Sequence, residues 1–96
     1  MDLFWTKSAR KDILTIEKYF IDLKVPKEII YAIILEIYQS GVTLKAFPML
    51  GKVLDEEETR KLVLTHYYFV ILYTVKNQKI NILRVLDTRM NNEQIL

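Results

Sequence analysis

The sequence predicts an α+β fold: an N-terminal strand, then an antiparallel two-helix hairpin packed on a curved antiparallel sheet, in the order β-α-α-β-β-β. Two consecutive stretches in the first half carry apolar residues three to four positions apart, which is the helical spacing. The second half contains runs rich in Val, Ile, Leu and Tyr that are separated by turn residues, as strands are. The length of 96 residues fits one domain, residues 1–96.

The composition excludes several classes of protein. Hydrophobic residues make up 51% of the chain, with two Gly and two Pro, which is not the profile of a disordered chain. There is no cysteine and one histidine, so we expect no disulfide, no metal and no cofactor. The net charge of +2 is small for a protein that binds phosphate backbones. There is also no Gly-rich phosphate loop and no Gly-x-Ser-x-Gly motif.

The sequence predicts a cytoplasmic protein that makes no contact with a membrane. Its longest apolar run, Ile29–Leu35, is too short to span a bilayer. No apolar segment of the kind found in signal peptides follows the basic cluster near the N-terminus. The lack of cysteine is compatible with a reducing compartment.

The first half predicts a short strand over Asp2–Thr6 and a helix over about Ser8–Leu23. One apolar stripe runs along this helix: Ala9, Ile13, Ile16, Phe20 and Leu23. Pro26 suits the first position of a second helix, which we expect to end near Ser40, with Gly41 as its terminator. Its isoleucines have strand propensity, but its length favours a helix. Because apolar residues nearly encircle this helix, we expect most of its surface to be covered.

The second half predicts a connection over Val42–Glu58, which contains Pro48 and Gly51, followed by strands. The strands and the turn between the last two are Thr59–Thr65, Tyr67–Val75, the turn Lys76–Lys79, and Ile80–Asp87. The middle strand is apolar on both sides, as a central strand is.

A two-residue turn at Asn77-Gln78 fixes the pairing of the last hairpin. The predicted partners are Val75 with Ile80, Tyr73 with Ile82, Ile71 with Arg84, and Phe69 with Leu86. Because side chains alternate between faces, this register predicts an aliphatic face for the helices, made of Val70, Leu72, Leu83 and Val85. The opposite face then carries Tyr67, Phe69, Ile71, Tyr73, Ile80, Ile82, Arg84 and Leu86. Such a patch marks an interaction site unless Ile95 and Leu96 of the tail cover it.

Four stretches of the sequence, taken in order, carry a resemblance to a known family. They are Phe4–Ala9 followed by Asp12, Ile13 and Ile16; Pro48–Gly51; Arg60–Leu62 with Tyr68–Tyr73; and Ile82–Arg89. They resemble the first strand and helix, the Pro-x-x-Gly loop, the second and third strands, and the last strand of the RelE/ParE family. The sequence is therefore similar to the toxins of bacterial type II toxin–antitoxin systems.

The resemblance implies a toxin that inhibits growth, takes part in plasmid stabilisation and is neutralised by a cognate antitoxin that wraps around it. In this family, RelE-type members cut mRNA on the ribosome, whereas ParE-type members are not nucleases and are known for blocking DNA gyrase. The long helical hairpin resembles the ParE type. A shared fold does not decide between these activities.

Cleavage of RNA needs proton transfer and stabilisation of the extra phosphate charge. Val70 stands where the family has a central-strand arginine, and the single histidine, His66, is predicted to be a turn residue. The sequence therefore favours a toxin that binds its target without cutting RNA, and no catalytic residue is assigned. Two alternatives stay open: a RelE-type mRNA endonuclease that acts with the ribosome and mRNA, and a non-toxic binding module.

The candidate functional or target-binding residues are Arg60, Tyr67, Tyr73, Arg84, Asp87 and Arg89. The arginines offer phosphate contacts, and the tyrosines offer stacking for a base. Each also has a structural interpretation. Arg84 pairs with Asp87, a glutamate or the tail; Arg60 is a solvated edge charge; the tyrosines pack; and Asp87 with Arg89 fixes the junction between sheet and tail.

Overall fold

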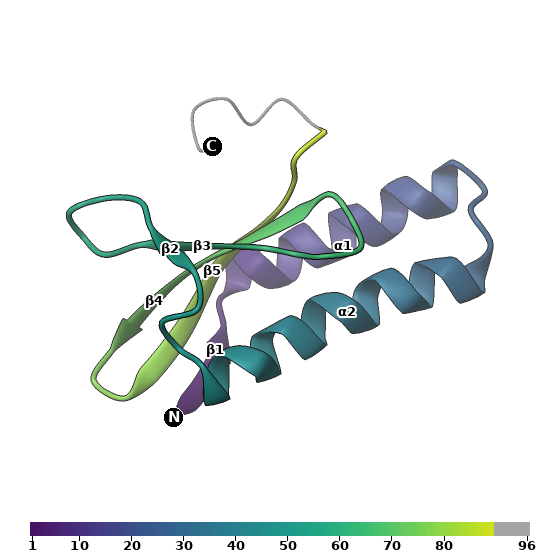
Figure 1. The fold of residues 1–96 in the computed structure, drawn as a ribbon. Helices are drawn as coiled ribbons and strands as arrows, with labels where there is room; N and C mark the ends of the chain where they lie inside the picture. The colour runs from purple at the N-terminus through teal and green to yellow at the C-terminus, as the bar shows by residue number, and fades with distance from the viewer. Residues whose placement is uncertain (90–96) are drawn as a thin grey trace.

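The computed structural model describes residues 1–89, and these form two helices and five strands (Figure 1). In chain order the elements are β1 Asp2–Trp5, α1 Lys7–Asp22, α2 Lys27–Ala46, β2 Lys52–Val53, β3 Arg60–Val63, β4 Phe69–Lys76 and β5 Lys79–Asp87. The strands make one sheet in the order β1-β5-β4-β3-β2. The predicted α+β class and the order of its main elements are confirmed.

The sheet is mixed, which the prediction of an antiparallel sheet did not include. The first strand, β1, pairs parallel to β5, with Leu3 opposite Ile80. The connection after α2 also contains the two-residue strand β2, which pairs antiparallel to β3. The strand β1 therefore forms one edge of the sheet, and β2 forms the other.

Helix α1 forms as its sequence predicts. The hydroxyl oxygen of Thr6 accepts a hydrogen bond from the backbone N–H of Ala9, which caps the first turn. The predicted stripe is buried except for Leu23, which follows the helix and is exposed. Lys24 then takes a positive φ of 61°, and the chain turns toward α2.

Helix α2 begins at Lys27, directly after Pro26, but it does not end at Gly41. It continues to Ala46, because Gly41 serves packing instead of termination. A Cβ at Gly41 would lie 2.5 Å from Cζ2 of Trp5, so glycine is what allows β1 to approach the helix. Trp5 also packs edge-on against Tyr38, with ring centroids 4.9 Å apart.

By length and composition, α2 is a helix that could cross a membrane. In this fold it lies beside α1 as one layer over the sheet (Figure 1). One side of it is buried, through Ile30, Ile33, Ile37, Gly41 and Leu44. The expectation that most of its surface is covered is wrong, since several large apolar residues on its other side are exposed to solvent.

The predicted register of the β4–β5 hairpin is correct only near the turn. Asn77 and Gln78 both have positive φ, as in a type I′ turn, and the two pairs that involve Val75 and Tyr73 are confirmed. An irregularity follows at Leu72/Tyr73, where Leu83 is the extra residue. The remaining partners are therefore Leu72 with Arg84, Ile71 with Val85, Val70 with Leu86, and Phe69 with Asp87.

The predicted assignment of faces is wrong. The helices pack on the face that carries Phe69, Ile71, Tyr73, Ile80, Ile82 and Val85. Val70, Leu72 and Leu86 form a separate buried cluster. Both sides of β4 are apolar, so alternation alone does not show which one the helices cover, and the bulge exchanges Val85 and Leu86. The predicted cover of the opposite face by Ile95 and Leu96 lies outside the described residues.

Candidate functional site

Tyr73 and Arg60 lie together beneath the loop that joins α2 to β2. The buried Tyr73 hydroxyl donates to the carbonyl of Pro48 and accepts from the N–H of Gly51, both at 2.8 Å. The Arg60 guanidinium donates to the carbonyls of Met49 and Gly51, at 3.3 and 2.7 Å. Burial raises the pKa of Tyr73, although the Gly51 N–H and the Arg60 charge act in the opposite direction. Both side chains thus hold the loop from below.

The loop that they hold displays apolar side chains to solvent. We call the set that follows α2 the apolar loop: Phe47, Met49, Leu50, Val53 and Leu54. Their exposed fractions lie between 39% and 64%. An apolar patch on a fixed backbone is a common feature of protein interaction sites. From the sequence, this segment was predicted only as a connection.

Arg84 ties α1 to β5. Its Nε and Nη2 atoms donate to the two carboxylate oxygens of Asp12, at 2.8 and 3.0 Å. The backbone N–H of Val85 donates to the same carboxylate at 2.9 Å. The hydrogen bond with Asp12 raises the pKa of Arg84 above its ordinary value. An ion pair for Arg84 was among the expectations, but its partner is Asp12 and not the predicted Asp87 or a glutamate. A pairing with the tail beyond Arg89 lies outside the described residues.

Asp87 and Arg89 form a second ion pair, at the end of β5. The carboxylate of Asp87 is buried and accepts from Nε, Nη2 and the backbone N–H of Arg89, at 2.8 to 3.1 Å. The guanidinium carbon also lies 4.9 Å from the ring centroid of Tyr68 and 6.0 Å from that of Phe20. The pair therefore fixes the end of the sheet, as the structural interpretation expects.

The last candidate, Tyr67, is partly buried and packs against the main core. Its neighbour His66 lies in the turn between β3 and β4, as predicted, and its Nδ1 is 2.9 Å from Oε1 of Glu36. The six candidates therefore do not form one site. Arg60 and Tyr73 act beneath the apolar loop, Asp87 and Arg89 at the sheet end, and the other two act separately.

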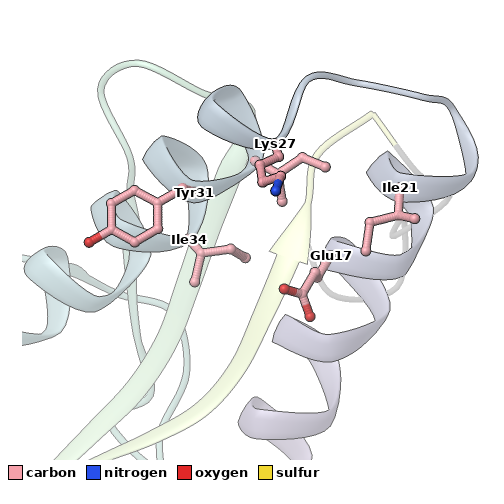
Figure 2. A pocket seen from close by; sticks show the side chains of 6 residues that line it. Glu17, Ile21, Lys27, Tyr31 and Ile34 are labelled. Carbon is pink, nitrogen blue, oxygen red and sulfur yellow. The ribbon is translucent and has the colours of Figure 1, made fainter.

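A groove of about 460 Å³ opens between the two helices. Its lining is mainly apolar: Ile21, Ile30, Tyr31 and Ile34, with Glu17 and Lys27 as the charged members. Figure 2 shows Glu17 and Ile21 on α1 facing Lys27 and Ile34 of α2 across this space. Sequence patterns did not show this groove, because it depends on how far apart the two helices lie.

An apolar stripe runs along the outer side of α2 from this groove. We call these four residues the α2 stripe: Tyr31, Leu35, Tyr38 and Val42. They recur at three- and four-residue spacing, and between 40% and 69% of each is exposed. Within residues 1–89 nothing covers them further. The sequence did indicate this stripe, because apolar residues occur on every side of the helix, but we interpreted them as evidence that the helix is buried.

Comparison with known proteins places these features in a family. Residues 3–92 match the family described as ParE toxin of type II toxin-antitoxin system, parDE. A solved structure of the chromosomal ParDE TA system from P. aeruginosa is similar, with a TM-score of 0.78 and 26% sequence identity. That similarity covers 88% of this chain and 92% of the other. No curated protein matches the chain. Because the family match spans nearly the whole sequence, the chain belongs to the ParE toxin family of type II toxin–antitoxin systems.

Proposed function

We propose that this ParE toxin arrests growth by binding a cytoplasmic protein target, with DNA gyrase as the target that its family suggests, and that a cognate antitoxin neutralises it. One observation carries the proposal. The three candidate arginines and Tyr73 are engaged within the fold, whereas two large apolar surfaces are exposed.

The arginines support binding rather than RNA cleavage. Cleavage would use cations that are free to stabilise charge on the phosphate. Arg60 donates to loop carbonyls, Arg84 to Asp12, and Arg89 to Asp87. Tyr73 is buried and bonded at its hydroxyl, so it does not offer a ring for stacking or a proton for transfer. These interactions favour the non-nucleolytic function over the RelE-type alternative.

The helical hairpin suits the antitoxin. An amphipathic helix binds an apolar groove through anchors spaced three to four residues apart, and the α2 stripe offers the same spacing. The groove between α1 and α2 is large enough for a bulky apolar side chain. Glu17 and Lys27 supply a polar rim of both signs, which is the usual anatomy of a protein interface. We assign the groove and the stripe to the antitoxin.

The apolar loop suits the target. Its backbone is held by three side-chain hydrogen-bond contacts at 2.7 to 2.8 Å, so little conformational freedom is lost when it binds. Its exposed side chains, such as Met49 and Leu50, are then presented in fixed positions. We therefore assign target binding to this loop.

Induction without antitoxin tests the function, with separate measurements of growth, mRNA integrity and DNA supercoiling. The proposal expects growth arrest, altered supercoiling and intact mRNA. Met49→Asp should relieve the arrest, while Leu14→Asp, which places the same charge on the exposed side of α1, should not. Site-specific mRNA cuts would support the RelE-type alternative, and normal growth would support the non-toxic binding module.

A further inference from the structure

A small pocket of about 160 Å³, lined by polar and apolar residues in equal number, lies between α2 and β3, beside the apolar loop. It has a single charged lining residue, Glu36. The other residues that line it are Ser40, Thr43, Leu50, Leu62, Val63, Leu64 and Thr65. Of the residues that line this pocket, only Leu50 belongs to the apolar loop, and none of its polar residues was among the candidates predicted from the sequence.

The carboxylate of Glu36 is only partly satisfied. Its side chain is 18% exposed, and Oε1 lies 2.9 Å from Nδ1 of His66. Oε2 is buried, and within residues 1–89 no hydrogen-bond donor reaches it. A buried carboxylate oxygen without a donor is unfavourable, because it has lost its hydration without replacement. A ligand that donates a hydrogen bond to Oε2 would therefore be favoured at this site.

Two of the hydroxyls that line the pocket are acceptors as well. The hydroxyl of Ser40 donates to the carbonyl of Glu36 at 2.8 Å, and that of Thr43 donates to the carbonyl of Gln39 at 3.1 Å. With their protons used in this way, both hydroxyl oxygens keep lone pairs for an incoming donor. One carboxylate, two acceptor hydroxyls and no basic lining residue together select a cation that carries several N–H groups.

His66 is a replaceable partner for this carboxylate. Its side chain is 76% exposed and lies in the turn between β3 and β4. An imidazole offers Glu36 one N–H from one direction. A guanidinium offers two parallel N–H groups that fit both carboxylate oxygens at once, and it keeps its charge at every physiological pH. An arginine side chain is therefore a better complement than His66.

The strand beside the pocket has an open edge. The N–H of Leu64 donates to Phe69 across the β3–β4 ladder, so by alternation the N–H and C=O of Val63 point the other way. On that outer side β2 pairs only with Arg60 and Lys61 among the described residues. The backbone of Val63 is thus available for pairing with an extended segment, a common mode of peptide recognition.

We propose that the Glu36 pocket recognises an arginine side chain on an extended segment of a protein partner, which pairs with Val63 while its guanidinium replaces His66 on the carboxylate. We take the antitoxin to be the protein that supplies this segment, and that identification alone rests on the proposed function.

The test is an NMR titration of the full-length, ¹⁵N-labelled toxin with N-acetyl-argininamide. We expect saturable shifts of the amide signals of Glu36, Ser40 and residues 63–65, with a dissociation constant of about 1–10 mM, as suits a single side chain. N-acetyl-citrullinamide, which has nearly the same shape without the charge, should bind at least about tenfold more weakly. Glu36→Gln should abolish the shifts, whereas Glu57→Gln, the same change in the exposed acidic loop, should not.

Three results would overturn the proposal: no saturable shift up to about 100 mM probe, equal binding of the citrulline probe, or equal binding by Glu36→Gln. If that variant does not fold, His66→Ala serves in its place. It frees Oε1 and should tighten probe binding, so weaker binding would overturn the displacement step. The growth assay separates this proposal from the function, because absence of toxicity in the wild type would leave the titration result unchanged.

Discussion

The phenol of Tyr73, in the middle of the sheet, forms two hydrogen bonds with the loop that joins α2 to β2: it accepts from the N–H of Gly51 and donates to the carbonyl of Pro48. Gly51 has no room for a side chain, since a Cβ there would lie 2.7 Å from Cε1 of the same tyrosine. The apolar loop and the core of the sheet are therefore one mechanical unit. A change at Tyr73 should alter both stability and target binding.

Tyr73→Phe should lower the free energy of unfolding by about 1–3 kcal/mol, because it leaves the N–H of Gly51 and the carbonyl of Pro48 without their buried partner. Denaturant titration followed by circular dichroism measures this loss. Tyr31→Phe is the matched control. Tyr31 is among the most exposed residues, so this substitution should change stability little. Equal effects of the two substitutions would show that Tyr73 does not anchor the loop.

The raised pKa of Tyr73 predicts a loss of stability at alkaline pH. In the unfolded chain its phenol ionises near pH 10, and in the folded protein it ionises at higher pH. This contribution is therefore complete below about pH 10 and is lost as the pH rises from there through the folded value. The difference in stability between wild type and Tyr73→Phe should shrink over that range. A difference that stays constant would contradict the burial of the phenol.

Asp12→Ala should cost about 1–3 kcal/mol of stability, because it removes the acceptor of the Val85 N–H as well as the partner of Arg84. Arg84→Ala alone should cost less, since 42% of its side chain is exposed and water replaces the lost contact. A double-mutant cycle should give a coupling energy of about 0.5–1 kcal/mol. A coupling of zero would mean that the pair does not link α1 to β5.

Gly41→Ala should destabilise the protein, although alanine is the better helix former by about 1 kcal/mol. The new methyl group would lie 2.5 Å from the Trp5 ring, which Tyr38 holds in place, and overpacking of this kind costs about 1–3 kcal/mol. Thermal unfolding shows whether the variant is less or more stable than the wild type. In combination with Trp5→Leu, which removes the indole ring, Gly41→Ala should stabilise the protein through the higher helix propensity of alanine. If Gly41→Ala alone stabilises the protein, residue 41 does not lie in close contact with the Trp5 ring.

Leu35→Asp on the α2 stripe should leave toxicity intact and weaken neutralisation by the antitoxin. The residue is exposed in the free toxin, so its replacement costs the fold little, but it would place a charge in an apolar interface. Growth rescue on co-expression of the antitoxin is the measurement. Phe4→Asp, an equally apolar-to-acidic change at the exposed side of β1, should still be neutralised. Rescue of Leu35→Asp at wild-type level would remove the stripe from the antitoxin interface.

The order of the elements was predictable because each carries its own local signal. Ala9, Ile13, Ile16 and Phe20 recur at helical spacing, and the Asn77-Gln78 turn separates two strongly apolar runs. What depended on distant contacts was not predictable. The helix α2 continues past Gly41, and this glycine serves packing against Trp5 of β1, which lies 36 positions earlier in the sequence.

The candidate residues show the same limit. Their residue types indicated correctly that they would form polar interactions, but the sequence alone did not show with which residues. The carboxylate that pairs with Arg84 lies 72 positions earlier, and the carbonyls that Arg60 contacts belong to a segment interpreted as a plain connection. The groove and the Glu36 pocket depend on the spacing between elements, which no local pattern encodes. The α2 stripe has helical spacing in the sequence, but which side of α2 stays exposed depends on distant contacts.

The extra residue Leu83 has a consequence for the whole of β5. A hairpin with a fixed two-residue turn assigns each position to one side of the sheet, and a single insertion reverses that assignment for everything beyond it. Before the bulge, Ile80 and Ile82 meet the helices, and after it Val85 does. The same reversal brings the carboxylate of Asp87 to a buried position opposite Phe69, where Arg89 binds it. Deletion of Leu83 would therefore remove the bulge and keep Asp87 opposite Phe69, because Arg84 would follow Ile82 directly and still pair with Leu72. Without the bulge, the full-length strand would place Leu86 opposite Phe69, and the buried carboxylate that binds Arg89 would be lost from that position.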